Sequence, residues 1–210
     1  DSLGNEEWTK IFNTGSIWHT GNSVIQTSDD GYAICGKTIS NNGDFWLIKT
    51  DFNGDTLWSK TFGGTGMDVC KKVIQTYDNG FALLGPEQSF GMAGDWTWLV
   101  KTDASGDSLW SITNSMAGND IVQSNDSGFV IAGRTDYYHN SMILKINKNG
   151  SPVWNNEYNL GQMDNLLYGI TNSNDSNYIS VGEDNPPESP PSFLTFIKVG
   201  DDGNEIWSQS

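Results

Sequence analysis

The sequence predicts an all-β fold made of four copies of one four-stranded unit, and three recurring patterns predict it. The first pattern is D-x-x-G-x-x-x-W, which returns roughly every 50 residues along the whole chain. Its tryptophans are Trp8, Trp58, Trp110, Trp154 and Trp207. Five matches in the same register indicate one repeated structural unit.

The second pattern is a pair of short apolar runs joined by a turn and ended by a glycine. Residues 24–36 read VIQTSDDGYAICG, and residues 73–85, 121–133 and, more loosely, 170–182 repeat this arrangement. The turn glycines are Gly31, Gly80 and Gly128, and the fourth copy has Asn177 instead. Because asparagine is the residue that best shares glycine's tolerance of a left-handed backbone, the pattern predicts a positive φ at this position.

The third pattern is an apolar run that ends on Lys49, Lys101, Lys145 or Lys198. Together the patterns predict strands near residues 23–27, 32–37, 45–50 and 56–62 of the first copy, with tight turns after the first and third. Strands this short and apolar must pack sheet against sheet. Radial repetition of four-stranded blades, a β-propeller, achieves this. A stacked solenoid is the alternative, although its usual repeats are shorter or helical.

We expect a single domain over residues 1–210. Its repeats span approximately 1–50, 51–102, 103–146 and 147–199, and a partial fifth motif covers 200–210. The chain therefore has one surplus copy of the fourth-strand motif. A closed four-bladed monomeric ring is the favoured interpretation. The alternative is an open segment of a larger propeller, which a second copy could complete as a homodimer.

The second and third patterns, read together with the tryptophan motif, resemble the secreted β-propeller repeats of bacterial and archaeal surface and extracellular proteins. The likeness covers essentially the whole chain and is closest in the first two copies. Later copies depart from it at Asn147 and Gly200, and at Met142 and Thr195. The resemblance implies propeller architecture and an extracellular or cell-surface location, but no chemistry. The chain opens on Asp1 without a visible secretion signal.

The charge balance excludes some partners. With a formal net charge of -15, the surface repels phosphate backbones and anionic lipid, so we expect neither nucleic-acid binding nor membrane insertion. The two cysteines, Cys35 and Cys70, lack metal-ligand spacing. They are interpreted as small core hydrophobes, with a disulfide between adjacent blades as the alternative.

Alternation of strand direction places the short glycine turns at one end of the ring and the variable connections at the other. Variable loops on a fixed scaffold are where binding usually occurs. Aromatic rings near amide and carboxylate side chains suit carbohydrate, so we expect ligand binding by Trp18, His19, Phe90, Trp96, Tyr137 and Tyr138. The competing interpretation is that these rings cap the hydrophobic layers between blades. The five recurring tryptophans are expected to pack between blades.

No catalytic residue, cofactor or metal ligand is expected. Residues 51–55 (DFNGD) resemble a calcium loop, so calcium is the alternative, but the downstream glutamate is missing and the later copy carries Lys148. No nucleophile or phosphate-binding motif occurs. The recurrent lysines, and the glutamines Gln26, Gln75 and Gln123, are interpreted as structural hydrogen-bonding groups.

The sequence therefore predicts a non-enzymatic extracellular or surface module for binding or scaffolding, which recognises glycan or protein through the variable connections. Two alternatives remain. One is a carbohydrate-active hydrolase or lyase on a propeller scaffold, and the other is a structural segment of a longer repeat protein.

Overall fold

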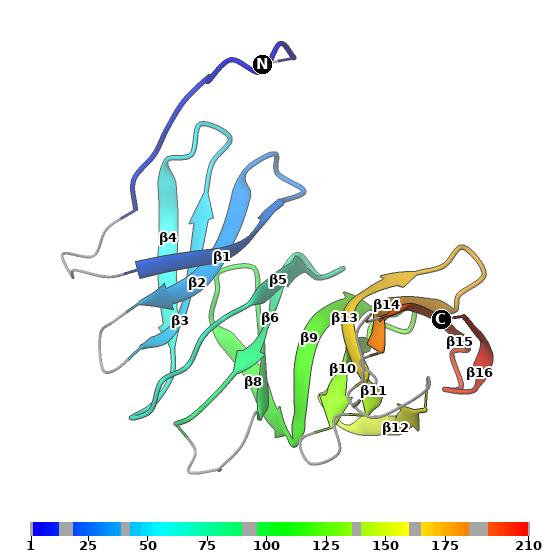
Figure 1. The fold of residues 1–210 in the computed structure, drawn as a ribbon. Coiled ribbons are helices and arrows are strands. Elements are labelled where there is room, and N and C mark those ends of the chain that lie inside the picture. The colour runs from blue at the N-terminus through cyan, green and yellow to red at the C-terminus, as the bar shows by residue number, and fades with distance from the viewer. Residues whose placement is uncertain are drawn as a thin grey trace.

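Sixteen strands form four antiparallel four-stranded sheets, each built from consecutive strands in chain order (Figure 1). The computed structural model describes residues 2–12, 19–38, 43–89, 96–135, 140–159, 165–184 and 193–209. These residues contain no helix, and therefore none long and apolar enough to cross a membrane. The all-β class and the four-stranded blades expected from the repeat are confirmed.

The sheets are named blades 1 to 4 in chain order. Blade 1 contains β1 (His19–Gln26), β2 (Tyr32–Thr38), β3 (Asp44–Thr50) and β4 (Thr56–Phe62). Blade 2 contains β5 (Lys72–Gln75), β6 (Phe81–Pro86), β7 (Thr97–Thr102) and β8 (Ser108–Asn114). Blade 3 contains β9 (Met116–Gln123), β10 (Phe129–Thr135), β11 (Ser141–Ile146) and β12 (Pro152–Tyr158). Blade 4 contains β13 (Asn165–Asn172), β14 (Tyr178–Asp184), β15 (Phe193–Val199) and β16 (Glu205–Gln209).

The turn between the first two strands of each blade differs from the expectation in one respect. Positive φ falls on Asp30, Asn79, Ser127 and Ser176, one residue before the position predicted from the glycines. The glycine meets a different requirement, close approach. A Cβ on Gly31 would lie 2.2 Å from the Thr50 carbonyl oxygen. In blade 4, where Asn177 takes this place, the paired Lys198 is more exposed than its counterparts.

Each blade has two faces, one toward the preceding blade and one toward the following blade. We call these the backward face and the forward face. Phe45 and Leu47 on the forward face of blade 1 pack with Phe81, Leu83 and Trp98 on the backward face of blade 2. The same arrangement joins blade 2 to blade 3 and blade 3 to blade 4. The protein therefore has three inter-blade cores rather than one central core.

Three of the recurring tryptophans, Trp58, Trp110 and Trp154, lie on the outer strands and contact the next blade, as expected. Trp58 packs edge-on against Phe81 with ring centroids 5.8 Å apart, and Trp110 packs against Phe129 at 5.9 Å. The Trp154 indole donates a hydrogen bond to the Asp201 carbonyl oxygen. Trp207 is the exception, because no blade of this chain follows it.

Both cysteines lie in the core between blades 1 and 2. Cys35 and Cys70 are fully buried and are not joined by a disulfide. Burial, together with a hydrogen bond between its thiol and the neighbouring Cys35, raises the pKa of Cys70 well above its usual value. A buried neutral thiol of this kind packs as a small hydrophobe.

The four blades form an open arc instead of the favoured closed ring (Figure 1). Within the described residues, no strand of blade 1 forms a substantial contact with a strand of blade 4. The N-terminal segment does not extend the last sheet, because β16 already supplies the fourth strand of blade 4. Of the two arrangements open to the sequence, the structure has the open segment.

Candidate functional site

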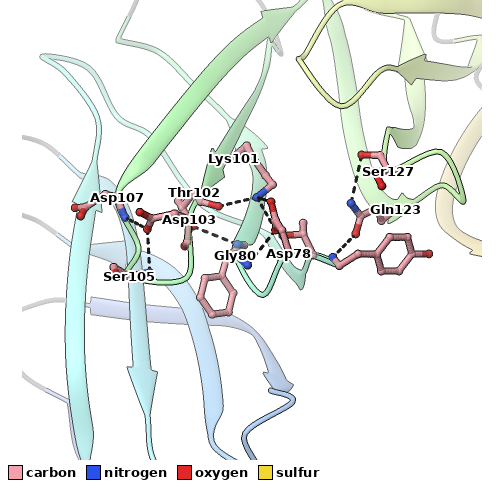
Figure 2. A network of polar contacts seen from close by, with 12 residues as sticks. Asp78, Gly80, Lys101, Thr102, Asp103, Ser105, Asp107, Gln123 and Ser127 are labelled. Atoms are coloured by element: carbon pink, nitrogen blue, oxygen red, sulfur yellow. Dashed lines mark hydrogen bonds and ion pairs between the residues drawn. The ribbon is translucent and has the colours of Figure 1, made fainter.

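The end of the arc that carries the short turns contains a repeated network of buried lysines. Lys101, at the end of β7, donates hydrogen bonds to the Asp78 carboxylate and to the Thr102 carbonyl oxygen (Figure 2). Lys49 bonds Asp29 and Thr50 in the same way. Because the arrangement repeats from blade to blade, it supports the structural interpretation of these lysines.

The carboxylates in this network are ionised over the ordinary pH range. The Thr27 hydroxyl and the Lys49 ammonium, which both donate to Asp29, lower the pKa of that carboxyl to about 2. Burial lowers the pKa of Lys145, but hydrogen bonds from its ammonium to Asp201 and Asp126 outweigh this and raise it. At the turn end, each of these buried lysines is therefore already paired with a carboxylate of its own blade or the next.

The recurrent glutamines also hold neighbouring blades together at this end. The Gln75 side-chain oxygen accepts a hydrogen bond from the Ser28 backbone N–H, 2.8 Å away. The Gln123 side-chain oxygen accepts one from the Tyr77 backbone N–H at the same distance (Figure 2). Each bond joins the first strand of one blade to the turn of the blade before it.

The segment that resembles a calcium loop forms a hydrogen-bonded turn. The Asp51 carboxylate accepts hydrogen bonds from the Asn53 and Asp55 backbone N–H groups, both at 2.9 Å. Asn147 binds the matching N–H groups in blade 3 with its amide oxygen. An uncharged side chain thus accepts the same two hydrogen bonds, so the spacing of the turn is explained without an ion. The described parts of the chain contain no group of three or more His, Cys, Asp or Glu residues placed to hold a metal.

Two of the six candidate ligand-binding residues lie in the described part of the chain. His19 begins β1, and its ring packs on Trp46 with centroids 4.8 Å apart. Trp96 lies beside β7 in a different blade, and its carbonyl oxygen accepts a hydrogen bond from the Glu87 backbone N–H. Trp18, Phe90, Tyr137 and Tyr138 lie outside the described residues. The structure therefore leaves the expected aromatic site untested.

Two buried carboxylates, Asp44 and Asp68, lie close together between blades 1 and 2. Burial, with Asp68 adding to it, raises the pKa of Asp44. Asp68 accepts hydrogen bonds from the Gln88 and Gly64 backbone N–H groups and from the Ser89 hydroxyl. These bonds tie the connection before β5 to the connection after β6. Asp68 therefore serves as a structural anchor, and not as a carboxylate free to act on a substrate.

A pocket of about 280 Å³ opens at the variable end between blades 2 and 3. It lies where β5, β9 and β13 begin and where β6 and β10 end. Its lining combines cationic, amide and apolar groups: Lys71, Pro86, Thr97, Ala117, Gly118, Asn119, Arg134 and Leu166.

The walls of this pocket are fixed by short contacts between the blades. The Thr97 hydroxyl donates to the Met116 carbonyl oxygen at 2.6 Å and accepts from the Gly118 N–H at 2.5 Å. The Asn119 amide donates to the Leu167 carbonyl oxygen of blade 4. These bonds join three blades around one opening, so the pocket is a preformed feature of the scaffold.

The glycine that ends the second sequence pattern shapes the same region. A Cβ on Gly133 would lie 2.0 Å from the Ala117 carbonyl oxygen, and the pairing of β9 with β10 shifts register at this residue. Gly36, Gly85 and Gly182 have equally close neighbours at the matching positions. Glycine is needed here because the backbone of the first strand bulges toward the second.

Lys71 and Arg134 give the pocket a charge opposite to that of the protein as a whole. Arg134 is the only arginine in a chain with a net charge of -15. A guanidinium group with a second cation nearby suits a carboxylate ligand. Sequence reasoning missed this pair because the two residues are far apart in the chain. The single arginine was the one signal that could have drawn attention to it.

Comparisons with known proteins support the architecture only. No family model and no curated protein sequence matches the chain. A crystal structure of a protein of unknown function from Bacteroides caccae is similar to 99% of this chain, with a TM-score of 0.61 and 10% identity. The chain spans 66% of that protein's length. A eukaryotic initiation factor (TM-score 0.39, 12% identity, 90% of this chain and 55% of that one) is a more distant match. So is a tail fibre of a Staphylococcus aureus phage (TM-score 0.29, 12% identity, 90% and 49%).

Proposed function

We propose that this chain is a non-enzymatic binding module, and that it recognises a carboxylate-bearing glycan in the pocket between blades 2 and 3. The observation that carries the proposal is that Lys71 and the single arginine, Arg134, both line one preformed pocket of an acidic protein. The resemblance to secreted propeller repeats supports a location outside the cell or on its surface.

The remaining lining residues favour a sugar over a simple anion. Pro86 and Leu166 supply apolar surface for the C–H groups of a sugar ring, and Asn119 and Thr97 lie among them as polar neighbours. The volume is near the lower end of ligand pockets, about 300 Å³, which suits one or two sugar residues. The structural bonds of Thr97 and Asn119 keep these walls in place without the ligand.

Calorimetric titration with glucuronic acid, N-acetylneuraminic acid and neutral glucose tests this function. We expect the two acids to bind and glucose to bind at least about tenfold more weakly, because glucose has no carboxylate to form an ion pair with the two cations. Arg134→Gln should weaken binding of the acids by a similar factor, since it removes the positive charge and the forked donor and keeps a polar side chain.

Lys148→Gln is the matched control. It removes one positive charge from the opposite, turn-bearing end of the molecule, so it should leave binding unchanged. Circular dichroism of each variant checks that the fold is intact. Equal affinity for glucose and the acids, or no binding of either acid, would contradict the proposal.

A further inference from the structure

The forward face is buried in three blades and exposed in the fourth. Leu47, Leu99 and Ile143 occupy the same place on β3, β7 and β11, and each is at most 1% exposed. Phe196 occupies this place on β15 and is 40% exposed, and its neighbour Leu194 is 66% exposed. Blade 4 thus presents an apolar face of the kind that the other three blades bury against the next blade.

The backward face of blade 1 is open near the inner strand. Val24 of β1 is 63% exposed, whereas the matching Val73 and Ile121 of blades 2 and 3 are buried. A cavity of about 160 Å³ lies beside it, with Ile34 and Trp46 in its lining. This face has the composition of an inter-blade surface and lacks a blade against it in this chain.

The N-terminal segment, residues 5–12, covers the outer part of the same face. Trp8 packs edge-on against Tyr32 with centroids 5.8 Å apart, the same separation as between Trp58 and Phe81. A Cβ on Gly54 would lie 2.8 Å from the Trp8 ring, which matches the closeness of Gly106 to Trp58. The segment therefore contacts blade 1 as the outer strand of a preceding blade would.

An ion pair also relates the N-terminal segment to an outer strand such as β4. The Lys10 ammonium lies 2.6 Å from the Asp55 carboxylate, and the Lys60 ammonium of β4 lies 2.7 Å from Asp107 in the next blade. Lys10 and Lys60 each stand two residues after their tryptophan. In β16, Trp207 is followed by Gln209 at the same spacing, and Gln209 can donate to a carboxylate.

Gln26 lies on the part of blade 1 that would face the turn of a preceding blade. Its amide N–H₂ points to the Asp30 carbonyl oxygen of its own turn, as the Gln123 amide points to Ser127. In blade 3 this orientation leaves the Gln123 oxygen to accept from the turn of the preceding blade. The Gln26 oxygen is therefore placed to accept from the turn of a blade docked before blade 1.

We propose that blade 4 of one copy of this chain docks on blade 1 of a second copy, with Trp207 in the site that Trp8 fills in its own chain. The two faces match because a forward face already packs against a backward face in each of the three inter-blade cores. This interface is separate from the ligand pocket between blades 2 and 3 and goes beyond the proposed function. The contact is head to tail, and the N-terminal segment competes with it. The matching charge of the two copies opposes docking, so added salt should strengthen it.

Sedimentation velocity over a range of protein concentrations tests the interface with the full chain. The double substitution Trp8→Ala and Lys10→Ala releases the N-terminal segment without touching blade 4. We expect it to tighten self-association at least about tenfold, because it removes the competitor. Adding Phe196→Asp should abolish the gain, since a charge in an apolar contact stays without a partner. Tyr77→Asp, an exposed aromatic residue in the turn of blade 2, is the matched control and should leave the gain intact.

Two results would overturn the proposal. One is a double variant that stays monomeric at every concentration while circular dichroism shows a folded protein. The other is self-association that Phe196→Asp and Tyr77→Asp affect equally. Trp207→Ala in the full chain is the second probe of the same face and should weaken association with little effect on folding, because Trp207 is already 43% exposed.

Discussion

Ser127 and Gly128 are neighbours in one turn, yet they meet opposite backbone requirements. Ser127 has φ of 66°, in the left-handed region that costs a residue with a Cβ roughly 1 kcal/mol. Gly128 is not left-handed, but a Cβ there would lie 2.3 Å from the Ile146 carbonyl oxygen. The side chain is therefore absent where space is missing and present where the backbone is strained.

Adding a side chain at Gly128 and removing one at Ser127 should have opposite effects on the free energy of unfolding. Gly128→Ala should lower the free energy of unfolding by about 2–4 kcal/mol, because the carbonyl of β11 has to move away. Ser127→Gly should leave stability unchanged or raise it by up to about 1 kcal/mol, since glycine adopts the positive φ freely. Urea unfolding followed by tryptophan fluorescence measures both changes. A larger loss from Ser127→Gly than from Gly128→Ala would contradict this account.

The sequence identified the correct turn but assigned the positive φ to the wrong residue. Asn177 in the fourth copy suggested a left-handed site because asparagine tolerates that conformation. What singles out Gly31, Gly80 and Gly128 is the carbonyl of the third strand, which is distant in sequence. A local pattern cannot reveal that neighbour. The structural interpretation of Lys49, Lys101, Gln75 and Gln123 is confirmed, because a side chain that repeats from blade to blade meets the same partner in each.

At the scale of a structural element, each blade depends on an ion pair whose two partners differ in exposure. The Lys101 side chain is 5% exposed, whereas that of Asp78 is 59% exposed. Burial raises the pKa of Asp78, but the hydrogen bonds that it accepts from Thr76, Lys101 and Gly80 outweigh this and lower it. Removing one partner leaves a buried cation, while removing the other leaves a solvated anion.

We therefore expect Asp78→Ala to destabilise the protein more than Lys101→Met. The first substitution leaves the ammonium buried with only the Thr102 carbonyl oxygen, and it should cost about 2–3 kcal/mol. The second keeps the apolar stem and leaves Asp78 solvated and still bonded by Thr76 and Gly80, so it should cost about 1 kcal/mol or less. Thermal and urea unfolding measure the difference.

Blade 4 offers the control for this element. Lys198 is 18% exposed in its pair with Asp175, so water can solvate the ammonium when its partner is removed. Asp175→Ala should consequently cost less than Asp78→Ala. Equal losses in the two blades would show that burial of the lysine does not decide the effect.

The repeat predicts elements well and the pocket poorly. The fourth strand predicted at residues 56–62 is confirmed at Thr56–Phe62, because the turn before it determines where it begins. The pocket joins Lys71 to Arg134, which no repeat position relates. Sites between blades form from residues that are a repeat or more apart in the sequence. A repeat pattern shows what the blades share, so it does not reveal the residues that make one junction differ from the next.

At the scale of the whole molecule, the open arc means that each blade is stabilised only by the blades next to it. Blades 2 and 3 are each packed on both faces. Blade 1 is packed on its forward face and partly covered on the other by the N-terminal segment, whose Trp8 contacts Tyr32. Blade 4 is packed on its backward face alone. Where each unit contacts only its neighbours, the terminal units lack part of the stabilising interface.

Amide hydrogen exchange on dilute, monomeric protein should reveal this order. We expect the slowest exchange in β7 and β11, faster exchange in β3, and the fastest in β15, because local opening is easiest where the fewest apolar contacts are lost. A closed ring would bury both faces of all four blades and give β3 and β15 the protection of β7. Equal protection would therefore contradict the open arc. Raising the protein concentration should slow exchange in β15 first, because the proposed docking of blade 4 on a second copy covers that face.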